Sequence, residues 1–211
     1  MSTFQSEQEA FWAGSFGDEY TERNNDAEGK SVDGRVMIYA KVALQTGRWS
    51  TVLDLGANRG LNAVAIKRLF PGTHMTSVEI NKTAASHLRK LADEVHECSI
   101  LDFEPPRQYD LVMITGVLIH INPDALPIVY RKMEQAAKRF VLISDYYNPT
   151  PVEVVYRGHA GKLFKRDFAG EFMDMFPGFR LVDYGFAYHR DPLFPQGDEN
   201  WFLLERSSAK S

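Results

Sequence analysis

The chain has 211 residues, of which 44% are hydrophobic and 25% are charged, and its formal net charge at pH 7 is −4. This length supports one buried core and is too short for two typical domains, and the acidic balance does not suit binding by neutralisation of nucleic-acid phosphates. No apolar run approaches the roughly 20 residues that cross a bilayer, and no basic region leads into an apolar stretch near residue 1. We therefore expect a single cytoplasmic domain over residues 1–211, with neither a membrane nor a nucleic acid as partner.

Cysteine and histidine usage adds two expectations. Cys98 is the single cysteine, so no internal disulfide can form, and a buried inert thiol is the simplest interpretation of it. The six histidines show no metal-ligand spacing, so we expect no bound metal.

The chain before residue 50 carries helical signals. Ser6 and Glu9 have the spacing of a capping box, and residues 32–44 form a longer amphipathic stretch. The aromatic residues Phe11, Trp12 and Phe16 are typical of a helix face that docks on a core.

Apolar runs alternate with helical stretches through the middle of the chain. The apolar runs are at 52–56, 75–80, 111–115 and 140–144, and the helical stretches are at 61–69, 82–91 and 123–138. Such alternation predicts crossover units and a parallel sheet of the α/β class. Pro105 and Pro106 leave room for a short helix at most before the run at 111–115. Further on, 180–188 and 200–205 are aromatic-rich strands that predict a hairpin at one sheet edge, which permits a homodimer as well as a monomer.

The most informative motif lies at residues 52–60, where an apolar strand carries Asp54 and leads into a loop framed by Gly56 and Gly60. A loop of this kind at a helix start lets a ligand approach the backbone. The dinucleotide fingerprint has a glycine where this chain has Asn58, and an acid before the loop repels a pyrophosphate. Asp54 favours a ligand with a cationic end instead, as in S-adenosylmethionine.

Acids also follow the next two apolar segments. Glu79 ends the run at 75–80 and is expected to accept hydrogen bonds from ribose hydroxyls. Asp102 is placed to accept from the exocyclic amine of an adenine, with Ile80 and Leu101 covering the faces of the ring.

Together these motifs resemble the class I S-adenosylmethionine-dependent methyltransferases over about residues 50–145. The resemblance implies a Rossmann-like three-layer sandwich with a seven-stranded, mostly parallel sheet, an antiparallel C-terminal hairpin and an N-terminal helical lid. The lid would be part of a helical cap at 1–48, before a cofactor-binding core at 50–145 and a substrate-side insert with hairpin at 146–206. The expected cofactor contacts are Asp54, Gly56, Ala57, Asn58, Gly60, Glu79, Ile80, Leu101, Asp102, Thr115 and Gly116, with Trp12, Tyr20 and Arg23 from the lid.

The flanks of this core carry a narrower resemblance. Residues 9–24, 156–168 and 198–205 are similar to the methylases associated with pseudaminic acid biosynthesis. This resemblance, together with a basic stretch around residues 157–166, favours a small anionic acceptor that is sugar-acid-like or amino-acid-like.

Candidate catalytic and acceptor-binding residues lie on loops after the strands. His120 is placed for a general base, with a structural interpretation as a cap or packing residue before the helix at 123. The expected acceptor contacts are Asp145, Tyr146, Tyr147, Arg157, His159 and His189. For the basic members a solvated charged face is the competing interpretation.

The sequence thus predicts methyl transfer to an oxygen or nitrogen atom of a small metabolite. Two alternatives remain open at this point. One is a methyltransferase of nucleic acid or protein, for which the chain shows neither a base-flipping motif nor a basic arm. The other is a regulatory protein that binds S-adenosylmethionine without catalysis, since a fold does not fix a function.

Overall fold

A seven-stranded sheet forms the centre of the computed structural model, which describes residues 4–26 and 28–207. The strand order is β3-β2-β1-β4-β5-β9-β8, in which the first five pair in parallel and β9 pairs antiparallel with both β5 and β8. These strands are β1 (Thr51–Leu55), β2 (His74–Glu79), β3 (Glu94–Glu97), β4 (Tyr109–Thr115), β5 (Ala137–Asp145), β8 (Phe179–Ala187) and β9 (Glu199–Arg206). The expected α/β architecture with an antiparallel C-terminal hairpin is confirmed.

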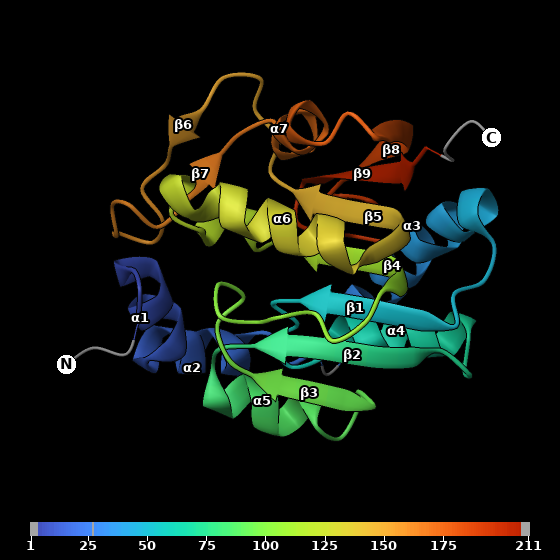
Figure 1. Ribbon diagram of the computed structural model, residues 1–211. Helices are drawn as coiled ribbons and strands as arrows, with labels where there is room; N and C mark the ends of the chain where they lie inside the picture. The colour runs from blue at the N-terminus through green and yellow to red at the C-terminus, as the bar shows by residue number, and fades with distance from the viewer. Residues whose placement is uncertain (1–3, 27, 208–211) are drawn as a thin grey trace.

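Helices lie on both faces of the sheet and at one of its ends (Figure 1). They are α1 (Glu7–Ala13), α2 (Ser15–Arg23), α3 (Lys30–Thr46), α4 (Leu61–Leu69), α5 (Lys82–Leu88), α6 (Leu126–Ala136) and α7 (Phe168–Met175), with single 3₁₀ turns η1 (Leu118–His120) and η2 (Pro123–Ala125). No helix in the described part of the chain is both long and apolar enough to cross a membrane.

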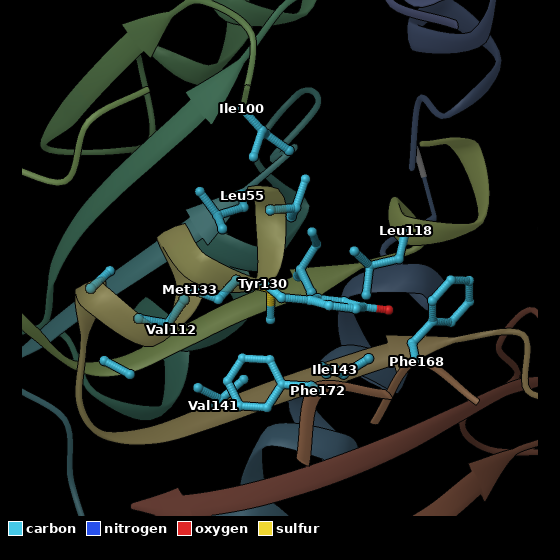
Figure 2. Packing of buried hydrophobic residues seen from close by; sticks show 14 of the residues in the cluster. Leu55, Ile100, Val112, Leu118, Tyr130, Met133, Val141, Ile143, Phe168 and Phe172 are labelled. Carbon is cyan, nitrogen blue, oxygen red and sulfur yellow. The ribbon is translucent and has the colours of Figure 1, made fainter. Parts of the chain in front are cut away.

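The apolar core is divided between the two faces of the sheet. On one face α3 and α4 bury Ile38, Val42 and Ile66 against the sheet. On the other, Tyr130 of α6 and Phe172 of α7 pack against β4 and β5 (Figure 2). Burying a large apolar side chain stabilises the fold by about 1.5–3 kcal/mol, so these two layers hold the strands in register. The ends of the strands are thereby fixed in space, and the loops that follow them are positioned by a rigid scaffold.

The strand order reverses direction between β1 and β4. The chain steps outward from β1 to β2 and β3, then returns to β4 on the other side of β1 and continues to β5. In parallel sheets a crevice opens outside the carboxyl ends of the strands at such a switch point, and ligands bind there. Helices α1 and α2 lie at this end of the sheet, toward which the arrowheads of β1 and β2 point (Figure 1).

The helix starts follow their capping residues. The capping box of Ser6 and Glu9 is present at the start of α1, as the spacing predicts. Asn81 accepts a hydrogen bond from the Ala84 N–H at the start of α5, and Asp167 caps α7 in the same way.

Some elements differ from the sequence expectation. The helical stretch expected at 123–138 ends at Ala136, and β5 begins at Ala137 rather than at 140. The segment after β5 forms a short ribbon of β6 (Val152–Glu153) and β7 (Phe164–Lys165), followed by α7, and the sequence analysis identified none of these. Two-residue strands leave no periodicity to recognise, and α7 is only 8 residues long.

Candidate functional site

The loop after β1 presents backbone rather than side chains to a cavity at the carboxyl ends of the strands. The N–H groups of Gly56 and Ala57 both donate to the Val78 carbonyl, at 2.9 and 3.0 Å, which fixes the loop against β2. Gly56 has a φ of +75°, and a Cβ at this position would lie 2.5 Å from Val117 Cγ2. A side chain at residue 56 would therefore be strained and would close the loop against the segment after β4.

Gly60 has a different role from the rest of this loop. It starts α4 with a φ of +91°, and a Cβ there would lie 2.9 Å from Leu88 Cδ1. It does not line the cavity, whereas Ala57 and Asn58 do. Gly60 allows α4 and α5 to pack closely, and its contact with the cofactor stays a prediction.

Glu79, at the tip of β2, is held in the cavity by backbone donors. Its two carboxylate oxygens accept from the Asn58 N–H at 2.7 Å and the Asn81 N–H at 2.8 Å. Burial raises the pKa of Glu79, and these backbone hydrogen bonds oppose the shift. Each carboxylate oxygen can accept a further hydrogen bond, and Glu79 lines the cavity, as a ribose ligand requires.

Asp54 is fully buried at the tip of β1 and reaches the cavity through another side chain. Asn62 Nδ2 donates to both Asp54 oxygens, at 3.2 and 3.1 Å. The Asn62 Oδ1 accepts from Tyr39 OH at 2.7 Å and Arg35 Nε at 2.9 Å. Burial raises the pKa of Asp54 to about 7. Asn62 and Arg35 line the cavity and Asp54 does not, so these two are functional candidates that the sequence analysis missed.

The cavity wall beyond β2 contains the predicted apolar residues but a different acid. Ile80 and Leu101 line the cavity. Asp102 does not; it is exposed and accepts from Gln5 Nε2 at 2.6 Å. The carboxylate here comes from Glu9 of α1, which accepts a hydrogen bond from the Ser99 hydroxyl.

Gln8 also contributes a polar group to this wall. Its Nε2 donates to the Gly161 carbonyl at 2.9 Å, which fixes the orientation of the amide. Its Oε1 is buried without a hydrogen-bond donor among the described residues. Gln8 lines the cavity, so a small rotation of its side chain would bring this acceptor to a ligand N–H.

Helices α1 and α2 form a lid that is anchored to the core by several hydrogen bonds. Asn81 Nδ2 donates to Asp18 Oδ1 at 3.0 Å, and Arg59 Nη1 donates to the Thr21 carbonyl at 2.9 Å. Trp12 and Tyr20 of the lid line the cavity, as predicted. Arg23 does not line it, because its guanidinium pairs with Glu19 at 3.4 Å and lies over two aromatic rings of α2.

A second cavity, of about 370 Å³, continues from the first toward β5 and β9. The residues that line both cavities are Tyr20, Asn24, Arg35, Thr115, Gly116 and His120. The two cavities are thus neighbouring parts of one site that share a wall at the tip of β4.

His120 lies at this shared wall in η1. Its Nδ1 lies 2.6 Å from the Lys162 carbonyl oxygen, which can only accept, so Nδ1 carries the proton and Nε2 does not. The ring packs between Trp12, at 4.4 Å between centroids, and Tyr156, at 5.0 Å. Burial lowers the pKa of His120 to about 4, so the ring is neutral at pH 7 and is a weak base.

Two buried carboxylates line the second cavity. Asp145, at the end of β5, accepts from the backbone N–H groups of Val117 at 3.1 Å and Tyr146 at 3.2 Å. Glu199, at the start of β9, accepts from the Ser144 hydroxyl at 3.1 Å. Burial, with the Glu199 charge as a second cause, raises the pKa of Asp145 to about 7. Burial also raises the pKa of Glu199.

The predicted acceptor contacts divide between the cavity and the surface. Asp145 and Tyr146 line the second cavity. Tyr147, Arg157, His159 and His189 line neither cavity. His189 pairs with Asp198 on the hairpin loop, and the His159 ring packs 5.0 Å from Phe11. Glu199 was missed because nothing in the sequence near residue 199 shows that the hairpin returns it to the end of β5.

Both the sequence and the structure of this protein are similar to those of known proteins. Residues 52–139 match the family model of a methyltransferase domain. The structure is similar to 1,6-didemethyltoxoflavin-N1-methyltransferase from Burkholderia thailandensis, with a TM-score of 0.71 and 15% identity over 99% of this chain and 93% of that one. The protein has a methyltransferase fold. The same methyltransferase fold is found in magnesium protoporphyrin IX methyltransferase from Synechocystis, with a TM-score of 0.68 and 13% identity over 98% of this chain and 100% of that one.

A third solved structure also has this fold. The methyltransferase fold is shared with the mitomycin 7-O-methyltransferase, with a TM-score of 0.65 and 18% identity over 96% of this chain and 61% of that one. A search of curated proteins finds no match to the sequence.

Proposed function

We propose that the protein is an S-adenosylmethionine-dependent methyltransferase that acts on a small molecule. The observation that carries this proposal is the pair of cavities that meet at the tip of β4. One contains a backbone loop and the ribose-type acid Glu79, and the other has polar walls and room for an acceptor. A donor and an acceptor that meet at the shared wall would be held at reacting distance, which is the main requirement of methyl transfer.

The cofactor is proposed to lie along the first cavity. Glu79 accepts from both ribose hydroxyls, and Ile80 and Leu101 cover the adenine. Asn62 and Arg35 receive the amino-acid end, where Arg35 can hold the carboxylate and Asp54 supports Asn62 from behind. Structures of two proteins with this fold contain S-adenosylhomocysteine or S-adenosylmethionine, which supports the same cofactor here.

The protein contributes to the reaction by orienting the two reactants and by excluding water. When bound, S-adenosylmethionine supplies a methyl group that its sulfonium already activates. Trp12 and Tyr20 of the lid cover the shared wall from the side of the solvent. His120, fixed by the Lys162 carbonyl, holds Nε2 as a hydrogen-bond acceptor rather than as a strong base.

The lid offers a direct test of this arrangement. In Gly17→Ala the added Cβ would lie 1.9 Å from the Trp12 carbonyl oxygen and 2.9 Å from Asn81 Nδ2, so α2 must move away from the core. We expect S-adenosylhomocysteine to bind about tenfold more weakly, measured by calorimetry. Gly72→Ala is the matched control, since a Cβ at Gly72 meets nothing within 4 Å. Equal affinities for the two variants would show that the lid does not contact the cofactor.

The low pKa of His120 gives a second test. His120→Phe keeps a ring between Trp12 and Tyr156 but removes Nε2, and we expect methyl transfer to slow by about tenfold with little change in cofactor affinity. Because a ring with a pKa of about 4 stays neutral above about pH 6, the factor should be the same from about pH 6.5 to about pH 9. If the wild-type rate instead has a limb near about pH 6.5 that His120→Phe removes, His120 is a general base.

The second part of the proposal concerns the chemical class of the methyl acceptor. A small metabolite is supported by the enclosed second cavity and by proteins of this fold named for toxoflavin, porphyrin and mitomycin methylation. A sugar-acid or amino-acid-like acceptor is what the resemblance to the pseudaminic acid-associated methylases implies. Among the described residues that line the second cavity, the guanidinium is that of Arg35, which is also proposed to hold the carboxylate of the cofactor. The predicted basic residues Arg157 and His159 would not contribute, since they lie outside the cavity.

One experiment separates this proposal from its alternatives. Pure protein is incubated with methyl-labelled S-adenosylmethionine and a cell extract, with and without prior nuclease and protease treatment. Label transferred to small molecules in both extracts supports the proposal. Label that disappears after digestion indicates a nucleic-acid or protein acceptor. Cofactor binding by calorimetry without transfer to either extract indicates a regulatory protein.

A further inference from the structure

Charged groups are divided unevenly between the second cavity and the surface around it. Among the described residues that line the cavity, the carboxylates are Asp145 and Glu199, and Arg35 is the one lining guanidinium. Arg35 is already engaged, because its Nε donates to Asn62 and its Nη1 donates to the Ser31 carbonyl at 3.0 Å. Among the described residues, the cavity lining therefore has more groups that can carry a negative charge than groups that carry a positive one.

The basic segment around the cavity does not offset this charge. Lys162 pairs with Glu7 at 3.5 Å, and Arg166 pairs with Glu171 at 2.7 Å. Lys165 lies over the Tyr146 ring, on neither cavity wall. None of these three cations lines the cavity, so they do not offer an anion-binding group within it.

Glu199 has an unused acceptor inside the cavity. Its side chain is about nine-tenths buried, with 9% exposure, and Oε2 accepts from the Ser144 hydroxyl. No described residue donates to Oε1. Glu199 lines the second cavity, so this oxygen can accept a hydrogen bond from a ligand that brings an N–H group.

Asp145 connects this acidic region to the place of methyl transfer. It accepts from the Val117 N–H at 3.1 Å, and Val117 follows Gly116, which lines both cavities. A group held by Asp145 is therefore next to the shared wall. His120 at the same wall is uncharged at pH 7, so it does not repel a cation there.

We propose that the second cavity binds its acceptor through a protonated amino group placed between Asp145 and Glu199, and that this nitrogen is the methyl acceptor. The inference rests on the proposed function and makes it more specific, since it selects N-methylation and an amine substrate. An acceptor whose reacting end is anionic is excluded from this position by the two carboxylates.

The chemistry balances without a further reagent. The bound ammonium first gives one proton to a carboxylate, which leaves a neutral amine with a free electron pair. That pair forms the nitrogen–carbon bond to the methyl group while the carbon–sulfur bond breaks, and its electrons return to sulfur, which becomes a neutral thioether. The positive charge passes to the methylated nitrogen, and the proton on the carboxylate is later released to water. A carboxyl whose pKa is near neutrality, as for Asp145, is suited to taking up and releasing this proton.

Blocking amines in the acceptor mixture tests the inference. A small-molecule extract is divided, and one half is treated with an amine-selective acetylating reagent that is hydrolysed completely before labelled S-adenosylmethionine is added. We expect methyl transfer to the acetylated half to fall by about tenfold or more, because an amide nitrogen is neither cationic nor nucleophilic. Equal transfer to both halves overturns the amine assignment and leaves the proposed function standing. No transfer to the untreated half contradicts the proposed function itself.

Substitutions of Asp145 and Glu199 test whether these two acids bind the amino group of the acceptor. For Glu199→Gln and Asp145→Asn we expect the acceptor KM to rise by about tenfold, with the affinity for S-adenosylhomocysteine within about twofold of wild type. The control is Asp174→Asn, which removes a carboxylate from the exposed surface of α7 and should change neither value. Glu199→Gln keeps the shape of the side chain and its acceptor for Ser144, so it remains informative if Asp145→Asn fails to fold. An unchanged acceptor KM in Glu199→Gln, or an equal loss of cofactor affinity, overturns the proposed placement.

Discussion

Replacing Glu79 by Gln is expected to weaken S-adenosylhomocysteine binding by about 100-fold. Both carboxylate oxygens of Glu79 accept a backbone N–H, from Asn58 and Asn81, so the amide of Gln must turn its NH₂ toward one of these donors. The variant also loses the charge that strengthens hydrogen bonds to the ribose hydroxyls. Hydrogen bonds to a charged group contribute about 1.5–3 kcal/mol each, and a factor of 100 corresponds to about 2.8 kcal/mol. Calorimetric titration of each variant measures the difference.

Asp102→Asn is the matched control for this measurement. Asp102 and Glu79 are both acids that the sequence assigns to the cofactor, but Asp102 is exposed and bonded to Gln5 outside the cavity. We expect the affinity of Asp102→Asn to remain within about twofold of wild type. A loss comparable to that of Glu79→Gln would show that the adenine reaches Asp102, as the sequence predicts, and that Glu9 and Gln8 have no part in its recognition.

The sequence predicts this site best where a residue's position depends on a single strand. Glu79 and Gly56 follow buried apolar runs, and a parallel sheet brings the carboxyl ends of such runs to one edge. The sequence pattern around Glu79 and around Gly56 is enough to predict that each residue lines the cavity. The same reasoning fails at Asp102, because residues 98–108 are turns between β3 and β4, and periodicity does not indicate which way a turn residue points.

The residues that the sequence analysis missed come from segments far apart in the chain. Glu9 lies 90 residues from its partner Ser99, and Arg35 lies 27 residues from Asn62. Their placement depends on how the lid and α3 dock, which no local pattern reports. For Arg157 and His159 the opposite error arises. The sequence pattern assigns a basic stretch to the acceptor, whereas neither residue lines the second cavity and His159 packs on Phe11.

The buried acids that the lid and hairpin enclose also make the fold sensitive to pH. Asp54 and Asp145 have pKa values raised to about 7, mainly by burial, from an unfolded value of about 3.9. Between these values the folded protein binds more protons than the unfolded chain, so the free energy of unfolding falls as the pH rises. Acids with lowered pKa values, such as Glu94 and Glu205, act in the opposite direction at lower pH, where they are protonated. His120, whose pKa burial lowers to about 4, also acts in the opposite direction, because between about pH 4 and about pH 6.5 the unfolded chain binds a proton that the folded ring does not.

We therefore expect the protein without ligand to lose about 3 kcal/mol of unfolding free energy between about pH 5.5 and about pH 7.5, from about 2 kcal/mol for each of the two acids less about 1 kcal/mol for His120. Urea unfolding at the two pH values measures this difference. Asp54→Asn and Asp145→Asn should each reduce the loss by about 2 kcal/mol, because each removes one ionisation, whereas Asp174→Asn should leave it unchanged. A free energy that is constant or rises over this interval would mean that water or Arg35 already compensates both carboxylates in the folded protein. In that case the second cavity would not favour a cationic acceptor, so the same titration also bears on the amine that Asp145 and Glu199 are proposed to bind.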